Sequence, residues 1–479
     1  MSVRRRLAKV AVAGLLVASP YTHAIDVLRT EGGISPTPAG VIVPDPNGCQ
    51  FGAPEQPLLL AEAVQRALCS NPKTREAWAD VKAQAAGLGV ARAAYLPTIT
   101  GNGQVVRDDS ITDVTGHPTL SSATLATINS ESVQLNWTLY DFGARAAAVH
   151  NASALLAAAQ STENATLQSL FVAVAKDYYA AQAASAALAA AVDIEHMAAD
   201  SAKAASARVD KGIAPISDAL QAETAYTQAV LNRIKAQGAW QTAAGTLASD
   251  MDLSPDIPLE LPLVTAGVQP DATFTQSVGE LIEDARRDHP TVLAAQAQVD
   301  AAAAKVDQTR AEGLPNISLV SKYTRDNQPA SLGLGIPEFP ATGHEWYVGV
   351  QVTIPFFEGF GRMYQVRQGR AQLEQQEDAL DDARRQVGLE VWNSYQAVQT
   401  SIDSVKDSAE LLDIAQRSFT AAQHRYQAGV GNILELLNAQ TALANAQQQR
   451  VQALADWRAA RLRLAGSLGR LDLDNARER

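Results

Sequence analysis

Acidic residues follow two glycine-containing turns at equivalent places in the sequence. Asp218 comes shortly after the first turn, and Glu435 comes at the same distance after the second. The residues that would form the two turns are Gly212, Pro215, Gly429 and Gly431. Glycine favours the end of one helix and proline the first turn of the next, so each turn should separate two helices. Because a helix dipole stabilises a carboxylate near the N-terminus, both acids are predicted to have a capping or electrostatic role.

Groupings that would carry out catalysis or hold a metal are absent from the sequence. The seven histidines are scattered, and no Cys/His spacing is typical of a zinc site. Neither a His-Glu-x-x-His motif nor a nucleotide-binding P-loop occurs. We therefore predict a protein that is not an enzyme, has no cofactor and depends on a partner for energy.

The only two cysteines, Cys49 and Cys69, lie 20 residues apart. In an oxidising compartment they could form a disulfide that ties a proline-rich arm, residues 25–57, to the first helix. Two unpaired thiols are the alternative, and the sequence does not choose between them.

The start of the chain has the pattern of a secretory signal peptide, with basic residues before a short apolar stretch in residues 1–24. This stretch is far shorter than the roughly 20 residues of a membrane-spanning helix, so an N-terminal anchor is the weaker alternative. No other continuous apolar run is long enough to span a membrane, so a membrane protein would have to use strands. The formal net charge is −12, or −16 without residues 1–24, which argues against nucleic acid as a partner.

Two segments without proline, residues 143–209 and 361–427, should each form a single helix of 67 residues. At about 1.5 Å per residue, each helix would be roughly 100 Å long. A helix of this length cannot be buried in one globular core and must lie beside similar helices. A soluble antiparallel coiled coil would explain the helices equally well.

Two further segments, residues 132–140 and 346–354, alternate between apolar and polar residues as membrane strands do. Their apolar positions are predicted to face lipid: Val133, Leu135, Trp137, Leu139, Trp346, Val348, Val350, Val352 and Ile354.

Each of these strands has a predicted partner, residues 98–107 in the first case and 316–325 in the second. The polar segments between partners, 108–131 and 326–345, are predicted to be external loops. Membrane barrels begin at about eight strands, so a chain with four strands needs other copies. Two copies would supply about eight strands and three about twelve, and the sequence alone does not choose.

The two halves of the chain repeat one order of elements: a helix, two strands, a very long helix and a helix. Equivalent residues are offset by 217 or 218 positions, as in Leu96-Pro97 and Leu314-Pro315. We therefore predict a mainly α-helical protein whose duplicated unit contributes four strands. The predicted boundaries are a signal peptide at 1–24, an arm at 25–57, a first repeat at 58–254, a linker at 255–275, a second repeat at 276–471 and a tail at 472–479.

From Leu58 to Leu471 the chain resembles the TolC family of outer-membrane factors. The resemblance rests on the duplicated order of elements, on the two helix-turn-helix tips and on two strand-to-helix junctions. The junctions are Leu139-Tyr140-Asp141-Phe142-Gly143 and Phe356-Phe357-Glu358-Gly359. The resemblance implies a homotrimer in the outer membrane, with a shared twelve-strand β-barrel continuous with a periplasmic α-helical barrel. It also implies two partners, a periplasmic adaptor and an inner-membrane ABC transporter or proton-driven pump.

The resemblance leaves the exported cargo open among proteins, drugs and metal ions. Among subfamilies, the chain looks most like the channels of type I protein secretion. The outer-membrane component of a multidrug efflux system is the alternative within the family. A soluble periplasmic coiled-coil scaffold is the alternative outside it.

The resemblance also implies roles at the helix tips. Relatives close the entrance with a bond between a tyrosine and an acid, which correspond here to Tyr426 and Asp218. Two acids that form charged rings in the lumen correspond to Glu435 and Asn438, so the second ring position departs from the family pattern. An arginine that helps to latch some relatives is replaced here by Gly431.

Overall fold

The computed structural model describes residues 26–45, 47–262, 277–330 and 339–473. The predicted signal peptide at 1–24, most of the predicted linker and most of the C-terminal tail lie outside the described residues.

The chain divides into two compact units, and each unit draws on both halves of the sequence. The described residues of the strand unit fall within Met1–Ile34, Ala85–Ala152 and Asp307–Arg362. The helical unit comprises Ser35–Gln84, Ser153–Val306 and Met363–Arg479. The sequence repeats therefore do not correspond to the compact units, because each repeat supplies part of the sheet and part of the helical unit.

The helices repeat in length from one half of the chain to the other. The first half has α2 (Leu60–Ser70), α3 (Pro72–Ala93), α4 (Ala144–Asp210) and α5 (Ile216–Asp250). The second half has α6 (Val278–Asp288), α7 (Pro290–Ala311), α8 (Gly361–Gln427) and α9 (Ile433–Ser467). The two long helices, α4 and α8, have 67 residues each, and α5 and α9 have 35 each. A short 3-10 helix spans Pro118–Leu120.

The first helical segment of each repeat is broken in two, a feature that the predicted order of elements did not include. The breaks fall at Asn71-Pro72 and at His289-Pro290. Both residues before proline have an extended backbone, with a ψ of 133°, because the proline ring disfavours helical geometry in the preceding residue. Each side chain then caps the following helix: Asn71 Oδ1 accepts from Lys73 N at 3.0 Å, and His289 Nδ1 accepts from Thr291 N at 3.2 Å.

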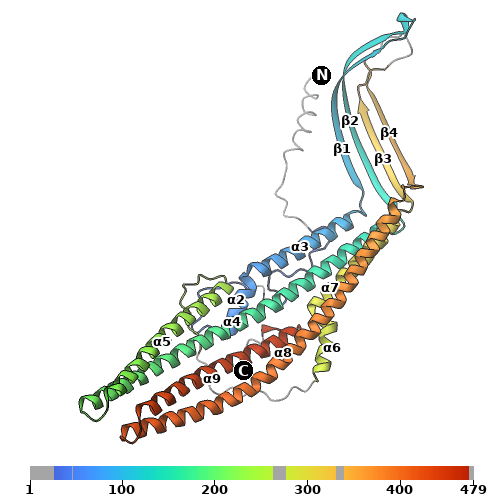
Figure 1. The fold of residues 1–479 in the computed structure, drawn as a ribbon. Coiled ribbons are helices and arrows are strands. Elements are labelled where there is room, and N and C mark those ends of the chain that lie inside the picture. The colour runs from blue at the N-terminus through green and yellow to red at the C-terminus, as the bar shows by residue number, and fades with distance from the viewer. Residues whose placement is uncertain (1–25, 46, 263–276, 331–338, 474–479) are drawn as a thin grey trace. The chain divides into compact units, whose positions relative to one another are not determined.

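Within the described residues, four strands form one antiparallel sheet in the order β1-β2-β3-β4 (Figure 1). Their bounds are β1 (Thr98–Thr112), β2 (Ser122–Tyr140), β3 (Asn316–Asp326) and β4 (Gly343–Thr353).

The first hairpin is longer than predicted, and the loop predicted at 108–131 is wrong over most of its length. β1 and β2 remain paired from Thr98 opposite Asn136 to Thr112 opposite Ser122. The extension contains the β-branched residues Ile111, Thr112, Thr124, Thr127 and Ile128, and such side chains fit a pleated surface even when many are polar. At the other end of the sheet, Ile354 lies just beyond the end of β4.

The strand register gathers most of the predicted apolar positions on one face of the sheet, whereas Leu139 lies at a β-bulge, where Tyr140 pairs with Ile317 in its place. Directly paired residues point to the same face. Val133 pairs with Tyr323, which pairs in turn with Trp346. Through Ser321 and Leu319 respectively, β3 also links Leu135 to Val348 and Trp137 to Val350. The exposed members of this apolar set include Val133, Trp137, Leu139, Trp346, Val348, Val350 and Val352.

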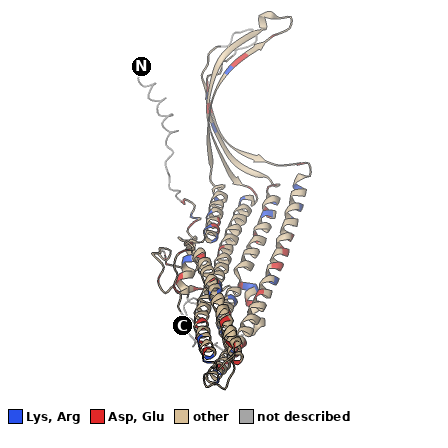
Figure 2. Ribbon diagram, turned by 60° about the vertical axis from the view of Figure 1, so that its left-hand side comes forward, with Lys and Arg blue, Asp and Glu red and all other residues tan. Residues whose placement is uncertain are grey.

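The strands carry few charges, whereas acidic and basic residues recur along the helices (Figure 2). Within the described residues, none of the helices combines the length and the apolar character needed to cross a bilayer.

An arginine braces each strand-to-helix junction in the strand unit. Arg145 Nε lies 2.8 Å from Asp141 Oδ2, and Arg145 Nη1 donates to the carbonyl oxygen of Thr138 at 2.6 Å. In the second repeat, Arg362 contacts Glu358 at 3.0 Å and donates to the carbonyl oxygen of Thr309 at 3.2 Å.

The braced turns have an unusual backbone. Two successive residues adopt positive φ in each junction, Phe142 with Gly143 and Gly359 with Phe360. Left-handed geometry is disfavoured for phenylalanine, so surrounding contacts must hold each turn. The arginines supply such contacts, which the two junction motifs in the sequence do not reveal by themselves.

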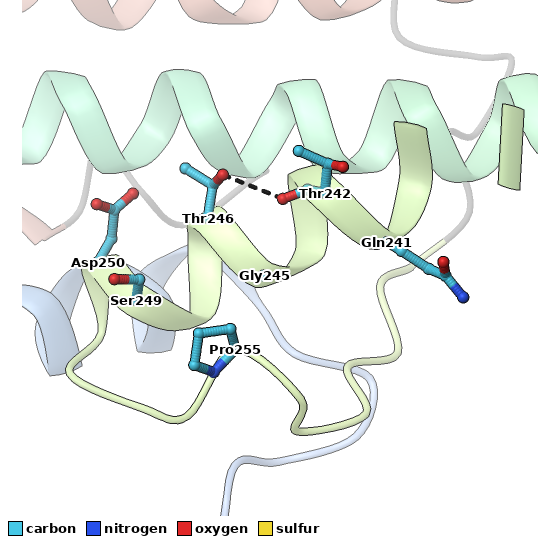
Figure 3. A pocket seen from close by; sticks show the side chains of 7 residues that line it. All are labelled: Gln241, Thr242, Gly245, Thr246, Ser249, Asp250 and Pro255. Atoms are coloured by element: carbon cyan, nitrogen blue, oxygen red, sulfur yellow. Dashed lines mark hydrogen bonds between the residues drawn. The ribbon is translucent and has the colours of Figure 1, made fainter. Parts of the chain in front are cut away.

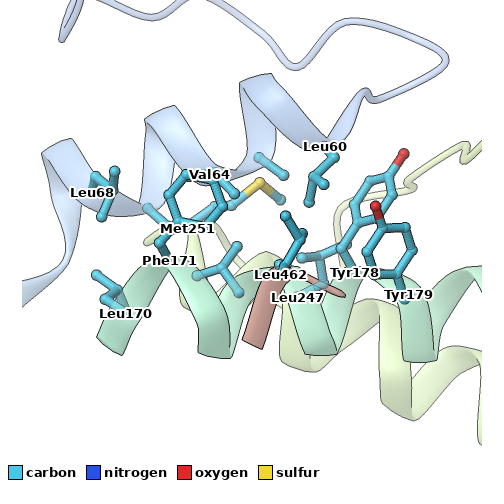
Figure 4. Packing of buried hydrophobic residues seen from close by; sticks show 14 of the residues in the cluster. Leu60, Val64, Leu68, Leu170, Phe171, Tyr178, Tyr179, Leu247, Met251 and Leu462 are labelled. Carbon is cyan, nitrogen blue, oxygen red and sulfur yellow. The ribbon is translucent and has the colours of Figure 1, made fainter. Parts of the chain in front are cut away.

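The largest core of the helical unit joins the N-terminal arm to α2, α4 and α5. Figure 4 shows Leu60, Val64 and Leu68 of α2 against Phe171 and Tyr178 of α4. Leu247 and Met251, from the end of α5, belong to the same cluster.

The arm is held by polar bonds and a covalent bond as well as by packing. Tyr178 Oη donates to the carbonyl oxygen of Leu58 at 2.9 Å, and Trp78 Nε1 donates to that of Ser35 at 2.9 Å. Cys49 and Cys69 are joined by a disulfide, with their Cα atoms 5.5 Å apart. Of the two states that the sequence left open, the structure therefore has the paired one.

Candidate functional site at the helix tips

The two helix tips of the helical unit have the same backbone design. Gly212 and Gly429 have φ values of +71° and +78°, a left-handed conformation that glycine adopts without a steric penalty. After α4, Gly212 N donates to Val209 O at 2.8 Å, and Ile213 N donates to Arg208 O at 3.0 Å. The second tip repeats both bonds, from Gly429 N to Tyr426 O and from Val430 N to Arg425 O. This pattern is the Schellman helix ending, and it gives both tips a defined shape.

The start of α9 is fixed by a side-chain cap and by an ion pair. Asn432 Oδ1 accepts a hydrogen bond from Glu435 N at 2.7 Å, as expected of an N-cap residue. The Glu435 carboxylate lies 3.3 Å from Arg425 Nε, and both side chains are exposed. Glu435 therefore has a basic neighbour within its own tip, a contact that was not predicted from the sequence. Asn438 is exposed on the same helix.

Gly431 lies where the second tip has no room for a side chain. A Cβ atom added there would be 3.0 Å from Tyr426 N and 3.1 Å from the carbonyl carbon of Arg425. Because these neighbours are backbone atoms, a side chain at position 431 would require the turn to move. The glycine at position 431 thus accompanies a tightly closed turn.

At the first tip, Asp218 N donates to the carbonyl oxygen of Pro215 at 3.0 Å. The side chain of Asp218 is half-buried, and its Oδ1 lies 3.5 Å from Ser217 Oγ. Asp218 therefore stands in the first turn of α5, as its position in the sequence predicts.

The predicted hydrogen bond from Tyr426 to Asp218 is not formed in this conformation. The Tyr426 side chain is only 4% exposed, and its hydroxyl has no hydrogen-bond partner among the described residues. Burial raises the pKa of Tyr426, with a smaller increase from Asp218 and an opposing effect of Arg208. The carboxylate thus affects the hydroxyl electrostatically without bonding to it. The Tyr426 ring packs into an apolar cluster, and its buried hydroxyl makes no hydrogen bond with the Asp218 carboxylate.

That cluster includes residues of all four helices that meet at the tips. Ala205 comes from α4, Ala222 from α5, Phe419 from α8 and Leu436 from α9. The two alanines are almost completely buried, and small side chains let helix backbones approach closely. The two tips therefore pack as one body within the helical unit.

Arg208 makes the main polar contact between the two tips. Its Nη1 donates to the carbonyl oxygen of Tyr426 at 2.7 Å, and its guanidinium carbon lies 4.8 Å from the centre of the Tyr426 ring. The sequence held a signal for this residue, because Arg208 and Arg425 are equivalent in the two repeats. Which of the two would reach the other tip could not be decided without the structure.

A shallow pocket lies at the opposite end of α5, away from the tips. Figure 3 shows its lining, which includes Thr242, Thr246, Asp250 and Pro255. Burial raises the pKa of Asp250, and the nearby Asp177 carboxylate raises it further, while Lys73 lowers it. Within the described residues, no cluster of three or more His, Cys, Asp or Glu side chains could hold a metal ion.

Comparison with known proteins identifies the class of protein that this fold defines. The family model described as "Outer membrane efflux protein" matches residues 63–250 and 281–470. The chain belongs to this family, the TolC family of outer-membrane channels. Its members are transport proteins without enzymatic activity, located in the outer membrane with a large periplasmic helical part.

Two curated relatives and one solved structure illustrate the similarity. Protein CyaE of Bordetella pertussis is 32% identical over 423 residues, which cover 87% of this chain and 86% of CyaE. The alkaline protease secretion protein AprF of Pseudomonas aeruginosa is 29% identical over 194 residues, 39% of this chain and 38% of AprF. The crystal structure of the outer membrane protein VceC of Vibrio cholerae superposes with a TM-score of 0.72 at 19% identity. That superposition covers 86% of this chain and 96% of VceC.

Proposed function

We propose that three copies of this chain form one outer-membrane export duct. Their sheets would close a barrel of about twelve strands, and their helices would form a tube across the periplasm. The observation that carries the proposal is the exposed apolar face of the sheet, which includes Val133, Trp137 and Trp346. Lipid is the environment in which such a face is stable, because water penalises exposed apolar area.

The edges of the sheet support assembly with other copies. Among the described residues, β1 pairs only with β2 and β4 pairs only with β3. Open backbone groups at a sheet edge cannot remain unpaired in hydrocarbon. Pairing of β1 with β4 of a neighbouring copy would satisfy both edges and give a closed ring.

Within the duct, the helix tips would form the periplasmic entrance. Glu435 and Asn438, which are exposed on α9, would face the lumen there. The charge of Glu435 would be reduced by its ion pair with Arg425, and Asn438 would add none. We therefore propose an entrance with a weak negative ring, latched near Tyr426 and Asp218.

For the cargo, we propose a protein that is exported by type I secretion. AprF is by name a secretion protein for an alkaline protease, and its similarity to this chain favours this class over small molecules. The partners would be a periplasmic adaptor and an inner-membrane ABC transporter. Multidrug efflux with a proton-driven pump is the second candidate, favoured by BepC of Brucella suis, an outer membrane efflux protein 27% identical over 423 residues.

Two measurements test the proposed function. Purified protein added to a planar lipid bilayer should give discrete conductance steps, and their absence in correctly folded protein would contradict the duct. Deletion of the gene should remove a protein from the culture medium without changing drug sensitivity. Increased drug sensitivity with an unchanged set of secreted proteins would favour efflux.

A further inference from the structure

Two arginines occupy the same position in the two repeats but make different contacts. Arg208 lies in the last turn of α4, and Arg425 lies in the last turn of α8. Arg425 pairs with Glu435, which belongs to the same tip. Arg208 leaves its own tip and contacts Tyr426 in the other. Of these two equivalent arginines, Arg425 therefore acts within its own tip, and Arg208 joins the two tips.

The contact of Arg208 uses the shape of its side chain as well as its charge. The guanidinium lies over the Tyr426 ring while Nη1 donates to the carbonyl oxygen of the same residue. A planar group can stack and donate at once, which a lysine ammonium cannot do in the same way. Gly429 also lies beneath this side chain, since a Cβ added there would be 3.8 Å from Arg208 Nη2. Arg208 thus covers the start of the second turn.

The place of the carbonyl oxygen makes this contact favourable. Tyr426 lies in the last turn of α8, where carbonyl groups have no partners within the helix and the dipole attracts cations. The Tyr426 oxygen already accepts from Gly429 N in the turn, and Arg208 donates to it as a second partner. The same guanidinium is near the C-terminal end of its own helix. One side chain therefore stabilises the ends of both long helices.

We infer that Arg208 is the positioning residue that clamps the α4–α5 tip to the α8–α9 tip, through the ring and the carbonyl oxygen of Tyr426. The inference rests on the proposed function in one respect only, that these tips border the entrance. In this chain the clamp takes the place of a tyrosine–carboxylate hydrogen bond, because the Tyr426 hydroxyl is buried away from a partner among the described residues.

Hydrogen exchange of the full-length protein in detergent tests the clamp without reference to transport. In Arg208→Lys and Arg208→Met, amides of the α8–α9 turn, residues 428–432, should exchange about five- to tenfold faster than in the wild type. Faster exchange in the α8–α9 turn, in either variant, supports the clamp. Acceleration that stays within residues 211–215 in both variants would mean that Arg208 only caps its own helix, and would overturn the inference.

Arg425→Lys is the matched control, because it changes the equivalent arginine of the other repeat. Its effect should remain within the α8–α9 tip, where Arg425 pairs with Glu435. Acceleration in residues 211–215 of this variant would show that either arginine couples the tips, and would contradict the special role of Arg208.

Single-channel recording then connects the clamp to the entrance. Arg208→Met should raise the conductance at least about twofold, because the tips would separate more easily. Arg233→Lys, in the middle of α5, should leave the conductance at the wild-type value. If the wild type forms no channel, the proposed function fails, while the exchange experiment still decides whether Arg208 clamps the tips.

Discussion

Tyr426 shows how the position of a residue and its bonding can diverge. Its place before the second tip was identified from the sequence, but its hydroxyl has no hydrogen-bond partner among the described residues. The ring and the main-chain carbonyl make the contacts instead, both with Arg208. The sequence could place the residue because the turn glycines are local signals. It could not give the partner, because the rotation of the ring depends on packing among four helices.

Replacement of Tyr426 by phenylalanine separates the role of the hydroxyl from the roles of the ring and the carbonyl oxygen. Tyr426→Phe keeps the ring and the carbonyl oxygen, so the conductance should stay at the wild-type value. The unfolding temperature should be equal or slightly higher, because a buried hydroxyl without a partner is removed. Tyr426→Leu, which loses the ring, should raise the conductance. A large increase in the phenylalanine variant would instead show that the hydroxyl bonds to Asp218 in the membrane.

Glu435 is expected to act on ion preference rather than on closure. Glu435→Gln should reduce the preference for cations at low salt, measured as the reversal potential across a salt gradient. At high salt the effect should shrink, because mobile ions screen an exposed charge. Asn438→Asp is the matched variant, since it adds an acid one turn later and should increase cation preference. Reversal potentials unchanged in both variants would place these residues away from the ion path.

Glu163 is a buried acid within α4 whose ionisation should weaken the fold. Its Oε1 has no hydrogen-bond partner among the described residues, and burial raises its pKa to about 7 from an ordinary value of 4.5. Because the folded protein binds this proton more tightly, the stabilisation is complete below pH 4.5 and is lost as the pH rises through 7. Glu163→Gln should therefore raise the free energy of unfolding by on the order of 2–3 kcal/mol at pH 8, and change it little at pH 4.5.

Thermal unfolding at the two pH values measures the effect of Glu163→Gln. Glu195→Gln in the same helix is the control, because Glu195 is paired with Arg233 and its replacement should not stabilise the protein. An equal shift at both pH values would contradict an origin in the ionisation of Glu163.

At the scale of elements, local sequence patterns predicted the type of each helix or strand better than its length. Two proline-free segments gave two 67-residue helices, because their sequences contain nothing that ends a helix. The first hairpin was predicted too short, because polar residues beyond Arg107 conceal a strand that pairing with β2 stabilises. The helix breaks before Pro72 and Pro290 correspond to X-Pro signals in the sequence, although the predicted order of elements did not include them.

The disulfide links the N-terminal arm to α2. The sequence could not decide whether it forms, because pairing depends on the distance between the two cysteines in the fold. Non-reducing peptide mapping of this protein, isolated from the outer membrane, should show Cys49 linked to Cys69 and no thiol that can be alkylated. The double variant Cys49→Ser, Cys69→Ser should lose about 3 kcal/mol of stability in thermal unfolding, as expected for a closed loop of this size. Complete alkylation of both cysteines without a reductant would contradict the bond.

At the scale of the whole molecule, the chain places apolar surface and open sheet edges in the strand unit. Its helical unit has its own cores, so the helices do not need the sheet for burial. The family and its location could be predicted from the duplicated order of elements and from the junction and tip motifs. The number of copies could not, because barrel closure is a property of strands from several chains.

The number of copies in the assembled protein tests the central claim most directly. Mass photometry of the full-length protein, extracted from membranes in mild detergent, should give a single species of three chains. Chemical crosslinking should stop at the same number. Four strands from one chain are too few to close a barrel, and the three copies proposed from the resemblance to the TolC family would supply about twelve. A stable monomer or dimer that still binds membranes would contradict the account.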